Sequence, residues 1–122
     1  MMQKLDVPNR LVLLYGSVFA LGCLDIVTTK TNLANGAYEA NVFARWFFSN
    51  LGFGNTVLIR YAVFAVLIVL SEFLLWMVEK RQDASTKRRF KMFVLLIWIT
   101  VFVSGLLTVI NNLFVMGKMG LL

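Results

Sequence analysis

Residues 55–91, NTVLIRYAVFAVLIVLSEFLLWMVEKRQDASTKRRFK, decide the fold of this chain. The segment begins with a long apolar run and ends in a cluster of basic residues. An apolar helix of about 20 residues crosses the roughly 30 Å of hydrocarbon in a bilayer. Lys and Arg beside such a helix are typical of the cytoplasmic side of a membrane. The segment therefore predicts a membrane-spanning helix followed by a cytoplasmic connection.

The composition of the whole chain also indicates a membrane protein. Hydrophobic residues make up 60% of its 122 residues, well above the roughly 45–50% of soluble domains. The chain has 12 Lys and Arg against 6 Asp and Glu, an excess that in a soluble protein would suggest nucleic acid. Here the basic residues gather beside apolar runs. We therefore expect them to contact lipid head groups, and we expect no nucleic acid as a partner. These residues are Lys80, Arg81, Lys87, Arg88, Arg89 and Lys91.

Three segments are long enough to span a bilayer, namely residues 11–29, 55–78 and 92–116. A fourth apolar segment, residues 38–51, is interrupted by polar residues and has the length of an interfacial or re-entrant helix. We predict an all-α integral membrane protein with three transmembrane helices and one short helix. A bundle of four transmembrane helices is the alternative. No linker-like stretch divides the chain, so residues 1–122 are predicted to form a single membrane domain.

The distribution of basic residues also predicts the orientation in the membrane. Residues 79–91 form the most basic segment between two predicted spans, so we expect this connection to be cytoplasmic. With three crossings the N-terminus is cytoplasmic too, in agreement with Lys4 and Arg10. The predicted localisation is the cell membrane, as a multi-pass protein.

A few polar residues interrupt the predicted spans at one depth. Asp25, Arg60 and the pair Asn111 and Asn112 each lie about one and a half turns from the same end of the predicted bundle. A charge in hydrocarbon is costly unless it is paired or hydrated, so such residues face the protein interior. Glu72 lies about 18 Å along the helix from Arg60 and cannot pair with it. Asp25 is therefore the expected partner of Arg60 within the spans.

Helical spacing adds neighbours to this polar level. Thr28, Thr29 and Asn32 follow Asp25 at i+3, i+4 and i+7 and share its helix face. Two interpretations remain open: a structural ion pair with its hydrogen bonds, or oxygen ligands and donors for a hard cation or a polar head group. The sequence indicates no particular metal. The predicted polar cluster consists of Asp25, Thr28, Thr29, Glu39, Asn41, Arg60, Asn111 and Asn112.

Two further helix faces have a distinctive composition. Thr100, Ser104 and Thr108 form a polar stripe on the third predicted span, which indicates either hydrogen bonds between helices or the wall of a hydrated path or pocket. On the first span, small residues at positions 16, 20 and 23 permit close approach of another helix. That helix belongs either to the same bundle or to a second copy of the chain.

Residues typical of catalysis are scarce. The chain has one Cys and no His, so it lacks the commonest general base and metal ligand. None of the serines belongs to a G-x-S-x-G motif. We therefore expect no catalytic residues and no cofactor. An intramembrane enzyme that uses the carboxylates of Asp25 and Glu39 is retained as an alternative, because burial can separate the pKa values of two acids.

The polar motifs resemble those of a known family. Asp25-x-x-Thr28-Thr29, a turn containing Gly, Glu39-x-Asn41, a basic residue early in the next span and Asn111-Asn112 are similar to an uncharacterised family of small archaeal and bacterial multi-pass membrane proteins. That family has Asp in its first helix and Glu-x-Asn-Pro at the start of its second. The resemblance runs from about residue 11 to residue 115, with Val42 at the position of the Pro. It implies a shape and a polar cluster, but no activity.

These observations favour a non-enzymatic small integral membrane protein. The leading hypothesis is an accessory or assembly subunit of a larger membrane complex, with lipid and other membrane subunits as partners. The alternative is a homo-oligomer that binds or conducts an ion or small solute through its outer polar cluster.

Overall fold

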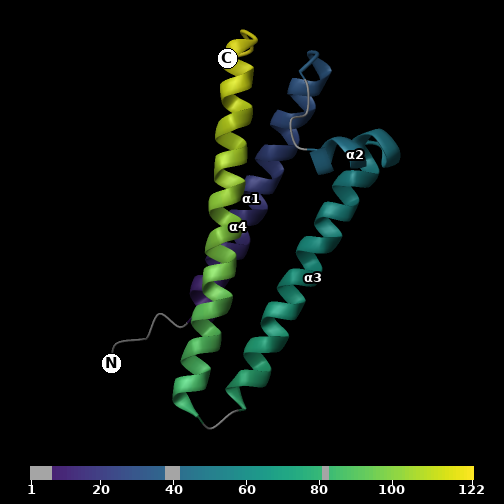
Figure 1. The fold of residues 1–122 in the computed structure, drawn as a ribbon. Coiled ribbons are helices and arrows are strands. Elements are labelled where there is room, and N and C mark those ends of the chain that lie inside the picture. Colours follow the sequence, from purple (N-terminus) through teal and green to yellow (C-terminus); the bar gives the residue numbers. More distant parts are fainter. Residues whose placement is uncertain (1–6, 38–41, 81–82) are drawn as a thin grey trace.

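The computed structural model describes residues 7–37, 42–80 and 83–122, and the side chains from residue 11 onward within these ranges. The described residues are almost entirely helical and contain no strand. Among them, three helices are long and apolar enough to cross a membrane, which confirms the predicted fold class. Figure 1 shows the helices in chain order: α1 Val7–Ala34, α2 Val42–Leu51, α3 Phe53–Glu79 and α4 Ala84–Lys118.

The three long helices do not form an evenly packed bundle. α1 packs mainly against α4, whereas α3 has far less contact with α4 and meets it near the connection between them. From that end α3 diverges from the other two helices, and α2 lies across the space at the opposite end (Figure 1). The short helix therefore stands where the distance between α3 and the α1–α4 pair is largest.

The apolar core lies in the half of the molecule nearest the α3–α4 connection. Leu11, Leu75, Val94 and Trp98 form it, each at most 6% exposed. The ring of Tyr15 meets that of Trp98 edge-on, with centroids 4.7 Å apart. The two rings and the aliphatic side chains thus fill the space between the helices near the α3–α4 connection.

Two polar groups beside this core are paired across the helices. The indole Nε1 of Trp98 donates a hydrogen bond to Oγ of Ser71 over 2.8 Å, and the hydroxyl of Tyr15 donates to Glu72 over 3.0 Å. Both acceptors lie on α3. These bonds join α3 to α4 and α1 at the end where the three helices converge.

A single glycine separates α2 from α3. Gly52 has φ +81°, a conformation that side chains with a Cβ rarely adopt. The rings of Phe48 and Phe53 stack across the corner with centroids 5.2 Å apart. The hydroxyl of Thr56 donates to the carbonyl oxygen of Gly52 over 2.7 Å. The chain thus turns sharply at one residue, and local contacts hold the turn.

The connection between α3 and α4 is shorter than the predicted loop of residues 79–91. α3 continues to Glu79 and α4 begins at Ala84, because Asp83 caps the new helix. Its Oδ1 accepts from the backbone N–H of Ser85 at 3.0 Å and its Oδ2 from the hydroxyl of Thr86 at 2.5 Å. Arg81 lies outside the described residues. Lys80 follows the last residue of α3. The other basic residues of the predicted loop belong to the first turns of α4: Lys87, Arg88, Arg89 and Lys91.

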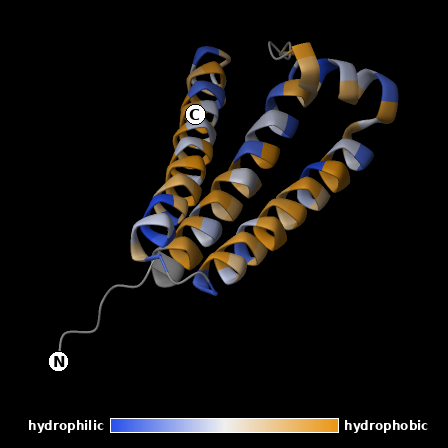
Figure 2. Cartoon of the chain, turned by 60° about the horizontal axis from the view of Figure 1, so that its bottom comes forward, coloured by the Kyte–Doolittle hydropathy of each residue, from blue (hydrophilic) through white to orange (hydrophobic). Residues whose placement is uncertain are grey.

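Most large apolar side chains on the long helices are exposed. Figure 2 shows hydrophobic residues along the middle of the helices and hydrophilic ones towards their ends. Leu58, Val69, Leu107 and Phe114 are each more than 60% exposed. An apolar surface of this extent suits helices that face lipid, because lipid tails are as apolar as the side chains.

Candidate functional site

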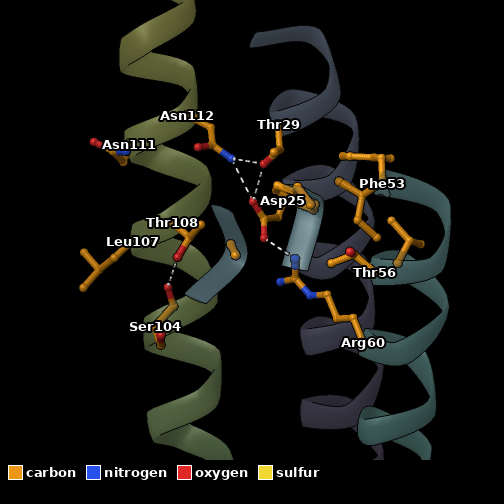
Figure 3. Close-up of a pocket in the computed structure, with 14 residues that line it drawn as sticks. Asp25, Thr29, Phe53, Thr56, Arg60, Ser104, Leu107, Thr108, Asn111 and Asn112 are labelled. Carbon is orange, nitrogen blue, oxygen red and sulfur yellow. Dashed lines mark hydrogen bonds and ion pairs between the residues drawn. The ribbon is translucent and has the colours of Figure 1, made fainter. Parts of the chain in front are cut away.

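The carboxylate of Asp25 lies at the centre of the polar groups. Asp25 belongs to α1 and is only 5% exposed. Its Oδ2 lies 2.5 Å from Nη1 of Arg60 on α3. Its Oδ1 accepts hydrogen bonds from the hydroxyl of Thr29 at 3.0 Å and from Nδ2 of Asn112 on α4 at 2.8 Å. One carboxylate thus joins all three long helices (Figure 3).

The amide of Asn112 extends this network along α1. Its Nδ2 also lies 3.0 Å from the hydroxyl oxygens of both Thr28 and Thr29. Thr28 donates its own proton to the backbone oxygen of Leu24 at 2.8 Å, so its oxygen is an acceptor for Asn112. The network therefore pairs the polar face of α1 with one side chain of α4.

Asn32 continues the same face by one further turn. Its Nδ2 donates to the backbone oxygen of Asn112 over 3.1 Å. Its Oδ1 is buried and has no hydrogen-bond partner among the described residues. A buried acceptor without a donor costs about 1–3 kcal/mol. Asn32 is therefore held only through its amide nitrogen, and its unpaired oxygen lowers the stability of the fold.

The two partners of the ion pair differ in exposure. The side chain of Arg60 is 48% exposed, whereas that of Asp25 is 7% exposed. A guanidinium carries five N–H donors, and among the described residues only the contact of Nη1 with Asp25 engages it. The remaining donors of Arg60 are therefore open to a ligand or to lipid.

A cavity of about 710 Å³ adjoins the ion pair, between the four helices. Among the lining residues that the structure describes, only Asp25 and Arg60 are charged, and their formal charges cancel. The other polar groups in its wall are neutral hydroxyls and amides. α2 and the start of α3 contribute apolar side chains at one end. The polar lining consists of Asp25, Thr29, Thr56, Arg60, Ser104, Thr108, Asn111 and Asn112.

The predicted polar stripe of α4 lies along two cavities. Ser104 and Thr108 line both the cavity at the ion pair and a second, smaller one, and Thr100 lines the second alone. The hydroxyls of Thr100 and Thr108 each donate to a carbonyl oxygen four residues earlier, at 2.9 Å. These two hydroxyls have therefore used their protons in hydrogen bonds within α4, but their oxygens can still accept a hydrogen bond.

The structure brings part of the predicted polar cluster together. Asp25, Thr28, Thr29, Arg60 and Asn112 form the network described above. Asn111 lines the cavity but points away from Asp25 in Figure 3. The two remaining members, Glu39 and Asn41, lie outside the described residues.

Several lining residues were not predicted from the sequence. Thr56 lies one turn before Arg60 on α3, and this i, i+4 spacing could have identified it. Ala44 and Phe48 of α2 also line the cavity. No pattern in the sequence indicated them, because their position depends on the turn at Gly52.

The described residues do not suit a metal centre. They contain no group of three or more His, Cys, Asp and Glu side chains close enough to hold an ion. The one carboxylate of the network already accepts from Thr29 and Asn112 and pairs with Arg60. Among the described residues, the Asp25 carboxylate is thus part of a hydrogen-bonded ion pair beside an open cavity.

The chain belongs to the DUF5658 family, a domain of unknown function, whose model matches residues 17–118. Neither a curated protein nor a solved structure matches it. The predicted membership of an uncharacterised family is thus confirmed in this general form. The match covers all four helices in part or in full, including every residue of the Asp25 network.

Proposed function

We propose that this member of a family without an assigned activity is a non-enzymatic multi-pass membrane protein that binds a small polar group with no net charge. The cavity beside Asp25 and Arg60 is the binding site in this proposal. Its volume of about 710 Å³ falls in the range of roughly 300–1,000 Å³ typical of ligand pockets. The observation that carries the proposal is a half-exposed guanidinium that faces this cavity beside a buried carboxylate.

The charge balance of the wall supports a neutral or zwitterionic ligand. Asp25 and Arg60 already cancel, and a ligand with a net charge would bring an unpaired charge into a site of low dielectric. The free N–H groups of Arg60 suit acceptor oxygens such as those of a phosphate. The side chain of Ser104 offers a further hydrogen bond to the rest of the ligand.

The proposed orientation puts the cavity in the outer leaflet. If the basic connection between α3 and α4 is cytoplasmic, Arg60 lies towards the outer surface. α3 has 27 residues and is about 40 Å long, which exceeds the roughly 30 Å hydrocarbon layer by about 5 Å at each end. Arg60 lies about 10 Å from the start of α3, and hence about 5 Å inside the hydrocarbon, within reach of the head groups for a long side chain.

Binding accounts for the geometry better than conduction does. In the half of the molecule nearest the connection, Leu11, Leu75, Val94 and Trp98 fill the space between the helices. A continuous polar path through one copy of the chain would have to pass this apolar core. Conduction therefore requires an oligomer, whereas the cavity lies within one chain.

The test is binding of glycerophosphoethanolamine, a water-soluble zwitterion, to the protein in a non-ionic detergent. Titration calorimetry measures the affinity. Thr108→Val removes one hydroxyl from the wall and is expected to weaken binding about fivefold, which corresponds to about 1 kcal/mol for one hydrogen bond. Thr31→Val is the matched control, because Thr31 makes the same bond to its own helix at 2.9 Å but does not line the cavity. Absence of binding to the unaltered protein contradicts the proposal.

A second candidate function is that of an accessory subunit in a larger membrane complex. The observation that favours it is the exposed small-residue face of α1. Gly16 and Ala20 are both exposed, and a Cβ added at Gly16 would meet nothing within 4 Å. Such a face lets a partner helix approach closely. The test is the mass of the complex extracted from native membranes, which Gly16→Leu should reduce and Ser17→Leu, on a neighbouring exposed position, should not. A monomer in both cases contradicts this function.

A further inference from the structure

The ligand of the proposed site has a second part that the polar cavity does not accommodate. Resting on the proposed function, we infer that it is a phospholipid-like amphiphile. Its zwitterionic head occupies the cavity at Asp25 and Arg60. Its acyl chain lies in the second cavity, which is mostly apolar and runs from the same arginine towards Trp98.

The two cavities share a wall. The second cavity has a volume of about 410 Å³ and is lined by residues of α1, α3 and α4. Arg60, Ser104 and Thr108 line both cavities. A molecule held by the guanidinium can therefore extend into either space without leaving the protein.

The lining of the second cavity suits hydrocarbon. Beyond the shared residues its wall is formed mainly by apolar side chains, among them Val18, Val63, Phe64, Leu67 and Val101, and Trp98 borders it as well. The hydroxyl of Tyr61, which also lines it, lies 3.3 Å from the Cys23 sulfur in a hydrogen bond. Little polar surface is thus left for a second hydrophilic group.

A missing side chain keeps this space open. Gly22 of α1 lines the second cavity, and a Cβ added there would meet nothing within 4 Å. Gly105 of α4 also lines this cavity, and a Cβ added there would lie 3.6 Å from that of Leu21, in ordinary van der Waals contact. Gly22 therefore borders unfilled space, whereas Gly105 lies against Leu21.

The order of the two cavities along the helices matches the order of parts in a lipid. Trp98 lies about 15 Å closer to the α3–α4 connection than Thr108 does. The polar cavity is therefore nearer the end of the bundle and the apolar one nearer its middle. In the proposed orientation a lipid of the outer leaflet has the same arrangement, with its head outside and its chain towards the midplane.

Fluorescence of Trp98 tests the inference directly. The chain has three tryptophans; Trp46 and Trp76 are exposed, whereas Trp98 is 1% exposed. In the variant Trp46→Phe/Trp76→Phe, a phosphatidylethanolamine with brominated acyl chains should quench Trp98 in a saturable manner in non-ionic detergent. The same lipid without bromine should compete. Quenching that rises linearly with lipid and never saturates overturns the inference.

Two glycine variants separate the cavity from general lipid contact. Gly22→Leu places a side chain in the second cavity and is expected to weaken saturable quenching at least tenfold. Gly117→Leu is the matched control, because Gly117 also lies in a long helix, has equally open surroundings and does not line the cavity. A second pair, Val63→Phe within the lining and Val66→Phe outside it, guards against misfolding of the glycine variant. Equal binding by all four variants overturns the inference.

Comparison of head and chain distinguishes this inference from the proposed function. The complete lipid should bind at least tenfold more tightly than glycerophosphoethanolamine, and more tightly than a brominated fatty alcohol. If the head alone binds as tightly as the lipid, the acyl-chain site is wrong and the polar site stands. If neither binds, both are wrong. If an anionic lipid binds more tightly, the claim that the head group is zwitterionic is wrong. If the protein is a dimer that Gly22→Leu dissociates, a second copy of the chain covers the second cavity and the acyl-chain site is wrong.

Discussion

Nδ2 of Asn112 lies 2.8 Å from Oδ1 of Asp25, although the two residues are 87 positions apart in the sequence. This contact joins the last third of α4 to the middle of α1. The same nitrogen is in contact with the hydroxyls of Thr28 and Thr29. The neighbouring Asn111 points away from the carboxylate (Figure 3). Two identical side chains in consecutive positions therefore have different roles.

This difference predicts unequal effects of two equivalent substitutions. Asn112→Leu removes the only amide that contacts Asp25 among the described residues, and should lower the free energy of unfolding by about 1–2 kcal/mol, since one interhelical hydrogen bond contributes about 0.6 kcal/mol. Asn111→Leu should change it by less than about 0.5 kcal/mol. Unfolding in mixed micelles of increasing dodecyl sulfate measures both values. Equal losses contradict the assigned network.

The ion pair predicts a non-additive double substitution. Arg60→Leu leaves the buried carboxylate of Asp25 without its counter-charge and should cost about 3 kcal/mol of unfolding free energy. Adding Asp25→Asn keeps the hydrogen-bond geometry but removes the charge. The double variant should therefore recover at least half of the loss. Strictly additive losses of unfolding free energy would show that the two side chains do not interact. Arg88→Leu, at an exposed position, is the control for the loss of a positive charge.

The hydrogen bond between Trp98 and Ser71 predicts a loss of stability at the other end of the molecule. Ser71→Ala leaves the buried indole N–H without its acceptor, which should cost about 1–3 kcal/mol. The emission maximum of Trp98 should shift to shorter wavelength in the Trp46→Phe/Trp76→Phe background. Ser17→Ala, at an exposed position of α1, should leave both quantities unchanged. An unaltered emission spectrum of the Ser71 variant contradicts the bond.

The cap of α4 predicts a pH dependence outside the membrane. Hydrogen bonds from the Thr86 hydroxyl and the Ser85 backbone hold the pKa of Asp83 below its ordinary value of 3.8. Because the folded-state pKa is the lower one, the stabilisation is fully present above pH 3.8 and is lost as the pH falls through the folded pKa. Carboxyl NMR of Asp83 should show a midpoint below 3.8, and Thr86→Val should raise it. A midpoint at or above 3.8 in the unaltered protein contradicts the cap.

The proposed orientation predicts which residues a membrane-impermeant maleimide reaches. In a Cys23→Ala background, Ser49→Cys on α2 should react in intact cells. Ser85→Cys at the start of α4 should react only after the membrane is permeabilised. Both serines are exposed, so access and not burial decides the result. The reverse pattern places the cavity in the inner leaflet.

The sequence predicted the class of fold because length and apolar content alone decide which helices can cross a bilayer. It also predicted that Asp25, Arg60 and Asn112 lie at one level of the helices, because the rise of a helix converts sequence distance into length. It did not distinguish Asn111 from Asn112, since both are polar and only the rotation of α4 against α1 selects one. Nor did it predict the divergence of α3, which depends on unequal packing between helices of similar composition.

The start of α4 was predicted as a loop for a different reason. Charged residues such as Lys87 and Arg88 interrupt the apolar pattern that marks a span. They form helix nonetheless, because Asp83 supplies the cap and Lys and Arg favour helix. Hydropathy therefore indicates where a helix enters hydrocarbon, and not where the helix begins.

The sharp turn at Gly52 fixes how this molecule can change shape. With one residue between them and stacked rings across the corner, α2 and α3 must move together as a single arm. The chain joins this arm to the rest of the molecule at both of its ends, to α1 through residues 35–41 and to α4 through the α3–α4 connection. Between these two connections the Asp25–Arg60 pair joins α3 to α1, so any movement of α3 away from α1 has to break this ion pair.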